Sequence, residues 1–529
     1  MNSDAQLRND RLVDRLADIL GKDAVITDPA ERRFYSADVY SEGEHCAAAI
    51  KPKDVASLAK AIGAITASGY AVIGRGGGMS YTNGYTPIRA DTVTVDIGAM
   101  NRILEINESD MYITVEAGVT WKQIYDALKP KGLRLPFFGT FSGIRATVGG
   151  GLSQGALFMG TARHGQAADI VLGLDVVLAD GTLITTGQGG FKNAKPFYRT
   201  YGPDITGLFI HDGGAFGIKT KATLKLMRTP KAIGFASFAF PTIDKASQAM
   251  SEVARAGIAE EAYIFDPEST DKNMAGANVI EDLKTLAGVV KGQGSFAKGL
   301  IEGAKLVLAG RSFAKEGMFS LHMVAAGRCE AAVEADIATA REIAVKHGGE
   351  EMPNSIPKAV RADPFKPLNS VLGPKGDRWA AMNAKVAHSD AMKIIAAGDD
   401  LLKPYRDRMK ALNIWVSRLF IAIDSHAFSY EPVLHWDDEW LPVHVRTPEP
   451  GYLAKFKEPA ANPAASALVH EIRLKFADLF AQHGASSNQI GKTYPYLQSL
   501  KPDTAKFVTK LKDTLDPQRQ LNPGVLGFK

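Results

Sequence analysis

Two glycine-rich stretches decide how this sequence is interpreted: GRGGGMS at residues 74–80 and ATVGGGLS at residues 146–153. The first follows the apolar run YAVI, which predicts a strand that ends in a loop. Consecutive glycines let backbone N–H groups converge on one point because no Cβ blocks the approach, and such a nest binds phosphate oxygens. The structural alternatives are a flexible surface loop and close backbone packing in a glycine-rich domain.

Neither of the common nucleotide-binding loops fits the first stretch. It lacks the GK[ST] ending of a Walker A loop, and the residues after it, YTNGYTPIRADTVTVD, predict a loop and a strand. A G-x-G-x-x-G turn would instead open a helix. The second stretch follows about 70 residues later. Two phosphate-compatible clusters at this separation favour one extended diphosphate ligand, such as FAD, over a nicotinamide cofactor.

Composition is that of an ordinary globular protein. The chain has 529 residues, of which 51 are glycine, 45% hydrophobic and 23% charged, so neither disorder nor collagen describes it. Subtracting 58 acidic from 62 basic residues gives +4, which predicts neither a nucleic-acid nor a membrane partner. The two cysteines make no disulfide framework and no cysteine metal site. The N-terminus has no apolar signal core and no apolar run approaches 18 residues, so we expect a cytoplasmic protein.

Residues 1–230 are expected to form one α+β domain, because they hold 30 of the 51 glycines. A helix is predicted from Ala5 to Leu20, and another from Thr120, as its N-cap, to Leu128. A β-hairpin is predicted with Asp180-Gly181 at its turn. From residue 231 glycine becomes rarer, and helices over 244–256, 330–346 and 469–482 alternate with strands such as 318–327 and 415–423. This order predicts a second sheet covered on one face by helices.

The order of these motifs resembles a known family. VIGRGGGMSY, TVDIGAMNRILEIN, ITVEAGVTWKQIYDAL, ATVGGGLSQG, VLGLDVVLADG, GAFGIKTKATLKL and the tail LDPQRQLNPG are similar to the vanillyl-alcohol oxidase / 4-cresol dehydrogenase (PCMH-type) FAD-linked oxidase superfamily. The resemblance implies an α+β fold in which a PCMH-type FAD-binding domain of two α+β subdomains spans residues 1–230. It also implies an α+β cap domain with an antiparallel sheet over 231–484, and a segment over 485–529 that returns to the FAD-binding domain.

The resemblance also implies which residues hold FAD. The first loop would hold the diphosphate, and the second would line the diphosphate and the flavin ring. His164 would belong to a further element near the flavin. A later strand would lie near the adenine and ribose, and the C-terminal tail would contribute one side chain. The cofactor-binding residues carried over are Arg75, Gly76, Gly77, Gly78, Met79, Ser80, Thr147, Val148, Gly149, Gly150, Ser153, His164, Gly217, Ile218, Thr220 and Asn522.

The implied chemistry is hydride transfer from a substrate C–H to flavin N5, followed by reoxidation by oxygen or another electron acceptor. The substrate would be an alcohol-bearing or aromatic small molecule, and the family forms oligomers. Met79 stands where some relatives attach FAD through a His, so non-covalent FAD is favoured, although a link through a His or Tyr of the cap stays open. A redox-neutral flavoenzyme resembling alkylglycerone-phosphate synthase, a lactate- or glycolate-like 2-hydroxy-acid dehydrogenase and a mere FAD carrier are the alternatives.

Two departures from the family bear on the substrate. Phenol-oxidising relatives carry a Tyr at about the position of Met79 and a Tyr-Arg pair near the C-terminus. This chain keeps Tyr494 of that pair, with Lys492 as the nearest cation, which disfavours a para-phenol substrate. The metal-associated histidine pattern of the 2-hydroxy-acid dehydrogenase branch is also missing, which disfavours a D-lactate or glycolate substrate, and no metal site is predicted.

The stretch DSHAFSYEPVLHWDDEW at residues 424–440 supplies the catalytic candidates, because polar and aromatic groups gather there after the strand 415–423. We expect the chain to leave the sheet there into a loop, with Asp424 and His426 on one face of the strand. His426 and His435 are predicted to act as proton acceptor, and Tyr494 and Lys492 to orient the substrate. The alternatives are that the histidines are structural and hydrogen-bonded and that the tyrosine belongs to the core. His426, His435 and His444 are nine residues apart, a spacing that matches no metal motif.

Overall fold

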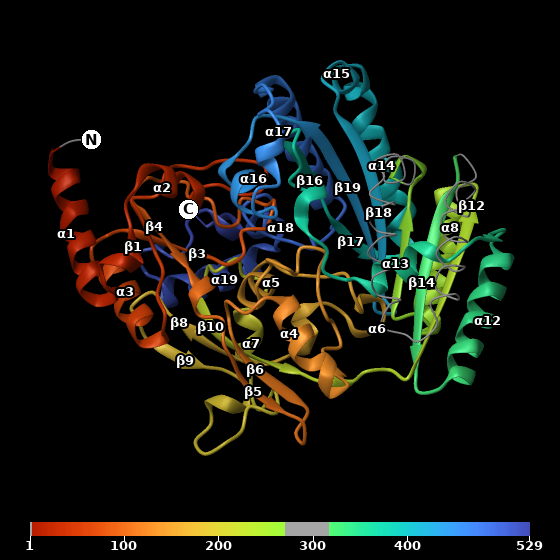
Figure 1. Cartoon of the computed structure of the whole chain (residues 1–529), viewed down its shortest axis with the longest axis horizontal. Helices are drawn as coiled ribbons and strands as arrows, with labels where there is room; N and C mark the ends of the chain where they lie inside the picture. Colours follow the sequence, from red (N-terminus) through yellow and green to blue (C-terminus); the bar gives the residue numbers. More distant parts are fainter. Residues whose placement is uncertain (1–2, 270–316, 529) are drawn as a thin grey trace.

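The computed structural model describes residues 3–269 and 317–528 (Figure 1). It is an α+β protein with a four-stranded, a five-stranded and an eight-stranded sheet, plus one two-stranded pair, β7 (Leu133–Arg134) with β11 (Met227–Arg228). The two smaller sheets come from the glycine-rich part of the chain and the largest from the part after residue 231. The predicted α+β fold, with an antiparallel sheet in the cap, is confirmed.

The first sheet has the order β1-β2-β4-β3, with β1 Val25–Ile26, β2 Ala48–Ile50, β3 Ala71–Arg75 and β4 Thr92–Asp96. Strands β2, β4 and β3 are parallel, and α3 (Val55–Ala67) connects β2 to β3. The helix begins where the Asp54 side chain accepts a hydrogen bond from the Ser57 N–H. The predicted N-terminal helix is present as α1 (Ser3–Leu20), which packs on α3.

The second sheet is antiparallel, with the order β5-β6-β10-β8-β9. Its strands are β5 Ile103–Asn107, β6 Tyr112–Glu116, β8 Val171–Val177, β9 Leu183–Thr185 and β10 Ile218–Lys225. The predicted hairpin is β8–β9, and Gly181 at its turn has φ +85°, a conformation that glycine adopts without strain. Helix α4 (Trp121–Leu128) begins at Thr120, which forms a capping box with Gln123 as the sequence indicates.

The largest sheet is antiparallel, with the order β15-β12-β14-β13-β18-β19-β16, and β17 also pairs with β19. The strands are β12 Ala232–Phe240, β13 Glu261–Phe265, β14 Phe319–Gly327, β15 Glu350–Glu351, β16 Asp377–Ala381, β17 Ala384–Ala387, β18 Trp415–Ile423 and β19 Ala427–Asp437. The prediction that the chain leaves the sheet after residue 423 is wrong. It turns at Asp424, which has φ +50°, and returns as β19 because residues 427–437 alternate between apolar and more polar side chains.

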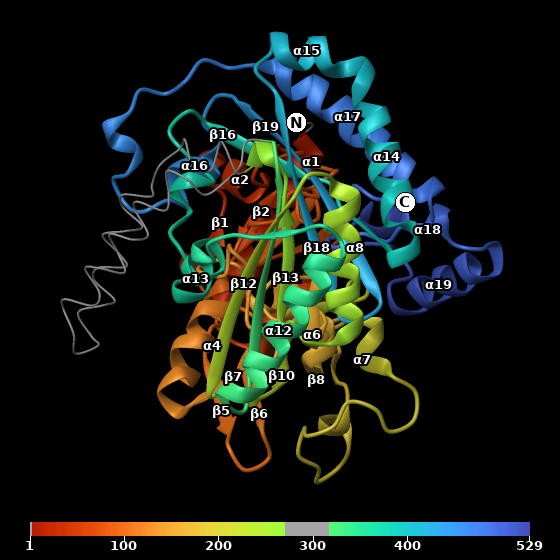
Figure 2. The ribbon, with the colours of Figure 1, turned by 90° about the vertical axis from the view of Figure 1, so that its right-hand side faces the viewer.

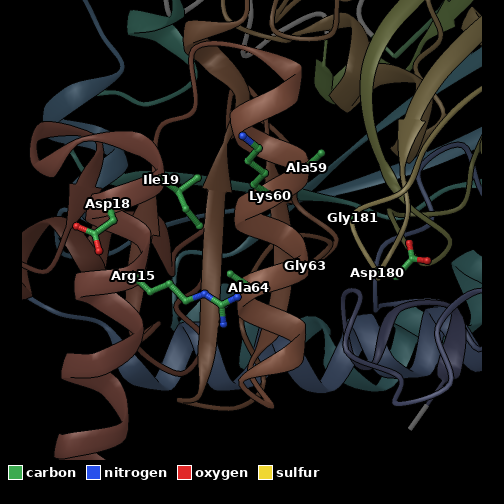
Figure 3. Close-up of a pocket in the computed structure, with 9 residues that line it drawn as sticks. All are labelled: Arg15, Asp18, Ile19, Ala59, Lys60, Gly63, Ala64, Asp180 and Gly181. Carbon is green, nitrogen blue, oxygen red and sulfur yellow. The ribbon is translucent and has the colours of Figure 1, made fainter.

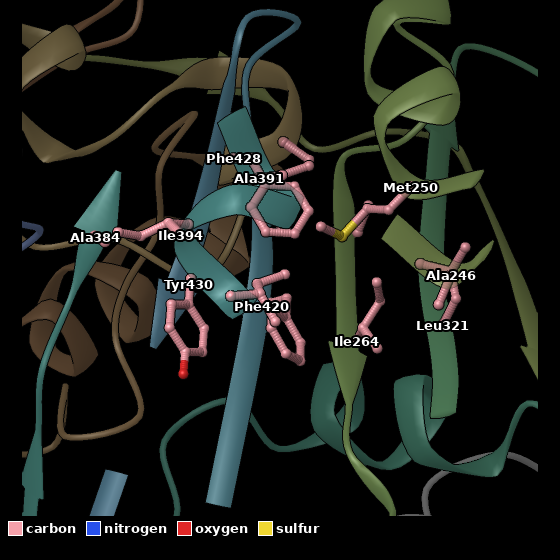
Figure 4. Packing of buried hydrophobic residues seen from close by; sticks show 14 of the residues in the cluster. Ala246, Met250, Ile264, Leu321, Ala384, Ala391, Ile394, Phe420, Phe428 and Tyr430 are labelled. Carbon is pink, nitrogen blue, oxygen red and sulfur yellow. The ribbon is translucent and has the colours of Figure 1, made fainter. Parts of the chain in front are cut away.

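One face of this sheet is covered by helices, as predicted. Phe420, Phe428, Tyr430 and Leu434 belong to one core with α8 (Ile243–Ala256), α14 (Ala391–Leu402) and α17 (Pro463–Gln482). Figure 4 shows the three aromatic rings of this set near Met250 of α8 and Ile394 of α14. Figure 2 shows α8 and α12 (Glu330–Lys346) in front of the strands that they cover. The opposite face therefore turns toward the glycine-rich part of the molecule.

The C-terminal tail returns to the first sheet after α19 (Pro502–Leu515). The Val72 N–H donates to the Gln520 carbonyl at 2.8 Å, and the Asn522 N–H donates to the Val72 carbonyl at 2.8 Å. The tail thus runs along β3, although the division of the chain at residues 230 and 484 stays a prediction. No helix within residues 3–269 and 317–528 is long and apolar enough to cross a membrane.

A candidate active site between the glycine loops and the large sheet

A cavity of about 630 Å³ lies between the two glycine-rich stretches and the large sheet. The first stretch contributes residues 76–80, and the second contributes Thr147, Gly150 and Gly151. The sheet contributes the side chains that alternate along one face of the β18–β19 hairpin: Trp415, Ser417, Leu419, Ile421, Glu431, Val433, His435 and Asp437. The structure thus brings together, in one cavity, glycine-rich stretches and sheet strands that are more than 260 residues apart in the sequence.

Close packing between the two stretches explains two of the glycines. A Cβ on Gly76 would lie 2.2 Å from the Thr147 Oγ1, and a Cβ on Gly77 would lie 1.9 Å from the Arg145 carbonyl oxygen. Neither distance leaves room for a Cβ. The backbone of the first stretch therefore lies directly against the Thr147 side chain and the Arg145 backbone. The packing alternative from the sequence therefore accounts for these two positions, independently of any ligand.

The first loop also fits a diphosphate. In the described part of the chain, the N–H groups of Gly77, Gly78, Met79 and Ser80 donate to no protein acceptor. Buried backbone donors are almost always paired, so a run of four facing a cavity indicates an anionic ligand with several oxygens. The residues present therefore fit the diphosphate of FAD.

The second stretch is less open to a ligand through its backbone. It forms α5 (Val148–Gln154), whose N-cap Thr147 accepts a hydrogen bond from the Gly150 N–H at 3.3 Å. The Val148 N–H donates to the Val119 carbonyl and the Gly149 N–H to the Ala117 carbonyl, each at 2.8 Å. These two amides are therefore occupied by protein acceptors, and Ala146, Thr147, Gly150 and Gly151 are the members that face the cavity.

Seven of the sixteen predicted cofactor residues line the cavity: residues 76–80, Thr147 and Gly150. Arg75 does not, because its guanidinium lies 4.2 Å above the Phe34 ring. His164 lies 3.4 Å from the Glu260 carboxylate, away from the cavity. Asn522 donates to the carbonyls of Gly84 and Gly213 and so joins two loops. The others that do not line this cavity are Val148, Gly149, Ser153, Gly217, Ile218 and Thr220.

Only His435 of the four predicted catalytic residues lines the cavity. Its ring stacks on Trp415 and its Nε2 lies 2.8 Å from the Ser417 Oγ. His426 is exposed at the turn of the β18–β19 hairpin, so the expectation that it faces the pocket is not met. The reason is that the chain turns at residues 424–426 and continues as β19. The residues of this hairpin that line the cavity lie on the same side of the sheet as Ile421, and His426 lies in the turn.

Tyr494 and Lys492 lie behind the cavity wall. The Tyr494 hydroxyl accepts a hydrogen bond from the Asn383 N–H at 2.6 Å, and burial raises the pKa of the phenol. The Lys492 Nζ donates to the Thr86 carbonyl at 2.6 Å, and burial lowers the pKa of this amine to about 7. Asn488 and Gln489, which precede Lys492 in the same C-terminal segment, do line the cavity.

Glu431 is the titratable group that the sequence analysis missed. It lines the cavity between Leu419 on β18 and Asn383, whose side-chain amide donates to its Oε2. Burial raises its pKa from 4.5 to about 7, partly offset by a hydrogen bond with Asn488. A signal was present: in SYEPVLHWD, Glu431, Val433, His435 and Asp437 alternate with apolar residues, which predicts a strand with Glu431 and His435 on one face.

Aromatic rings form much of the remaining wall. Tyr81 lies two residues after Met79, lines the cavity and packs on Trp379 with ring centroids 4.6 Å apart. A tyrosine is therefore present in the cavity although Met79 occupies the expected position. The other cavity-lining aromatic residues are Tyr85, Trp121, Phe141, Phe158, Phe265, Trp415 and Trp436.

A second hollow lies between α1, α3 and the β8–β9 turn (Figure 3). It is an open surface groove whose charged side chains are Arg15, Asp18, Lys60 and Asp180. It contains no residue of either glycine-rich stretch and no member of the large sheet. Among the described residues, no group of three or more His, Cys, Asp or Glu side chains is arranged to hold a metal ion.

Comparison with known proteins agrees with this geometry. Residues 46–187 match the family described as the FAD binding domain, and that range includes both glycine-rich stretches. The chain thus contains an FAD binding domain over these residues. Its fold is that of 4-ethylphenol oxidase from Gulosibacter chungangensis, with a TM-score of 0.74 at 18% identity over 98% of this chain and 97% of the other.

Two curated proteins are similar to this chain over part of their length. D-lactate dehydrogenase [cytochrome] 1, mitochondrial, of Saccharomyces cerevisiae is 32% identical over 200 residues, which are 37% of this chain and 32% of that protein. The glycolate oxidase subunit GlcD of Bacillus subtilis is 28% identical over 246 residues, 46% of this chain and 51% of that subunit. The matched part is thus about a third of the first relative and about half of the second.

Proposed function

We propose that this protein is an FAD-dependent oxidoreductase that oxidises the carbon bearing the hydroxyl group of a small alcohol with an aromatic or other apolar body. The observation that carries the proposal is the place of Glu431. Its carboxyl lines the same cavity as the unpaired N–H groups of the first glycine loop. A cofactor-binding loop and a base with a pKa of about 7 therefore share one enclosed space.

The residues divide the work between them. The N–H groups of residues 77–80 would hold the diphosphate, and the bound flavin would supply the hydride acceptor. Glu431 would accept the hydroxyl proton of the substrate, because a base with a pKa near the working pH is most effective. Leu419 and Phe265 would pack on the substrate and exclude water from Glu431.

The wall composition supports the class of substrate. Ten aromatic or imidazole rings line the cavity when His435 is counted with Tyr81, Tyr85, Trp121, Phe141, Phe158, Phe265, Trp379, Trp415 and Trp436. Apolar and aromatic walls with few polar groups bind apolar ligand bodies and orient them through those polar groups. An aromatic alcohol meets both requirements.

The test is anaerobic reduction of the FAD-loaded protein by a panel of aromatic, aliphatic and 2-hydroxy-acid alcohols. We expect aromatic alcohols to bleach the flavin, and Glu431→Gln to slow the bleaching about 100-fold or more while FAD stays bound. His426→Gln is the matched control, because His426 is exposed outside the cavity. An unchanged rate in Glu431→Gln, or no bleaching by any alcohol, would overturn the proposal.

A 2-hydroxy acid is the second candidate. Two cationic side chains, Lys366 and Arg378, line the cavity and would suit a substrate carboxylate. Similarity to a D-lactate dehydrogenase and to a glycolate oxidase subunit supports it as well. In the same panel, bleaching by D-lactate or glycolate and not by aromatic alcohols would select this candidate.

We also propose that FAD is bound without a covalent link, which acid precipitation tests by releasing the flavin into the supernatant. Adding oxygen after anaerobic reduction would distinguish reoxidation by oxygen from reoxidation by another electron acceptor. The cytoplasmic location and the homo-oligomeric state stay predictions.

A further inference from the structure

Glu431 is held inside a chain of buried hydrogen-bonding groups. The Asn383 side-chain amide donates to the Glu431 Oε2, and the Asn383 N–H donates to the Tyr494 hydroxyl at 2.6 Å. On the other side, Asn488 lowers the pKa of Glu431, and its Nδ2 donates to the Ser429 Oγ at 2.8 Å. A side-chain amide has two N–H donors, so Asn488 can serve both partners.

The two asparagines come from separate segments and are both buried. Asn383 lies between β16 and β17 and is 0% exposed, and Asn488 lies after α17 and is 2% exposed. Each keeps an unpartnered side-chain oxygen. A buried amide that leaves one polar atom unpaired costs free energy, so its retention beside a carboxyl indicates a role other than stability.

The cation Arg473 does not hydrogen-bond Glu431. Arg473 is buried, but it donates to the carbonyls of Ala381 and Tyr81 and lies over the Tyr40 ring. Tyr81 and Tyr494 both face the region of Glu431, and burial keeps the two phenols neutral by raising their pKa values. Lys385 on β17 pairs with Ser429 in the sheet and donates to the Gln166 side chain. The two neutral amides are therefore the groups that hydrogen-bond the carboxyl.

We propose that Asn383 and Asn488 are positioning residues that hold Glu431 in one orientation and stabilise its ionised form, so that a buried carboxyl can act as a base near neutral pH. The proposal rests on the proposed function of Glu431 as proton acceptor. Burial alone disfavours the carboxylate, whereas hydrogen-bond donors favour it. Arg or Lys in place of the amides would ionise the group fully and make it a weak base, and an apolar neighbour would leave it protonated.

The test removes each hydrogen-bond donor without adding a charge, in Asn383→Leu and Asn488→Leu. Infrared difference titration of the FAD-loaded protein follows protonation of Glu431, with Glu431→Gln identifying its carboxylic-acid band. We expect the midpoint for Glu431 to move up by about one pH unit or more in both variants. Asn101→Leu, at an exposed position, is the control that makes the same substitution at a distance and should leave the midpoint unchanged.

Kinetics supply the second measurement. The midpoint of the pH profile of the flavin-reduction rate should move to higher pH by the same amount. The limiting rate at high pH should stay within about tenfold of that of the unmodified protein. A merely structural role would lower thermal stability and leave both midpoints in place, and that result would overturn the proposal. If Asn383→Leu does not fold, Asn488→Leu decides alone. Because the infrared midpoint needs no substrate, a shift without any flavin reduction would support the positioning role and contradict the proposed function.

Discussion

Trp415 and His435 face each other across β18 and β19, with ring centroids 3.8 Å apart and planes within 9° of parallel. This pair defines which face of the hairpin meets the cavity, because Glu431 lies four residues from His435 on the same side of β19. Side chains at even separations on a strand share a face. The Trp415–His435 stack and the Glu431 carboxyl therefore belong to the same wall of the cavity. His435 and Glu431 are about 13 Å apart along β19.

We expect the rate of flavin reduction to rise with pH through a midpoint near the Glu431 pKa of about 7, because only the carboxylate accepts a proton. The measurement is stopped-flow bleaching under anaerobic conditions with saturating alcohol. A rate that is flat from about pH 5.5 to about pH 8.5 would contradict this assignment.

The same carboxyl should make folding stability depend on pH. The folded state has a higher Glu431 pKa than the value of 4.5 expected when unfolded, so it binds more protons between the two values. Stability should therefore fall as pH rises through that window, and Glu431→Gln should remove this part of the slope. Urea unfolding at about pH 5 and about pH 8 checks it, with His426→Gln as the comparison.

We expect His435→Phe to weaken substrate binding more than it slows the chemical step. Phenylalanine preserves the stack on Trp415 and removes the contact between the Nε2 and the Ser417 Oγ. KM should rise a few-fold while the limiting rate stays within about tenfold, since a general base contributes more than that. A loss of 100-fold or more in the limiting rate would instead make His435 the proton acceptor.

Gly77→Ala should abolish FAD binding or destabilise the domain by about 1–3 kcal/mol, because its Cβ would lie 1.9 Å from the Arg145 carbonyl oxygen. Gly189→Ala is the matched control, since its Cβ would lie 3.2 Å from the nearest atom and its φ is not positive. Flavin retention on gel filtration and the melting temperature measure both effects. Equal behaviour of the two variants would refute the packing argument.

Lys512→Met should lower the free energy of unfolding by about 3–5 kcal/mol. The Lys512 Nζ bonds the Asp516 carboxylate at 2.6 Å and the carbonyls of Ala215 and Leu521 at 2.7 and 3.0 Å, and both charged side chains are 1% exposed. Its loss would leave Asp516 buried without a cation and release the tail that runs along β3. Lys506→Met, in an exposed ion pair with Asp503, should change the free energy of unfolding by less than about 1 kcal/mol. Denaturant unfolding compares the two.

The sequence by itself determined the features that depend on neighbouring residues. The cap at Thr120, the turn at Gly181 and the strand before the first glycine loop are as predicted. Each depends on backbone conformation or on hydrogen bonds over a few positions, and the residue types required there are few. The ordered set of motifs likewise indicated the FAD-binding domain and an antiparallel cap.

Tertiary structure alone decided which side chains share the cavity. The sequence predicts His426 and not Glu431 as a catalytic residue, because it does not show that the chain returns as β19. The pairing of β18 with β19 joins Trp415 to His435 and Leu419 to Glu431, and so brings Glu431 into the cavity wall. Asn383, Asn488 and Tyr81 converge on Glu431 from three segments that no local pattern connects. The physical reason is that the pKa of a carboxyl depends on burial and on donors a few ångströms away in space, and those are set by packing of the whole chain.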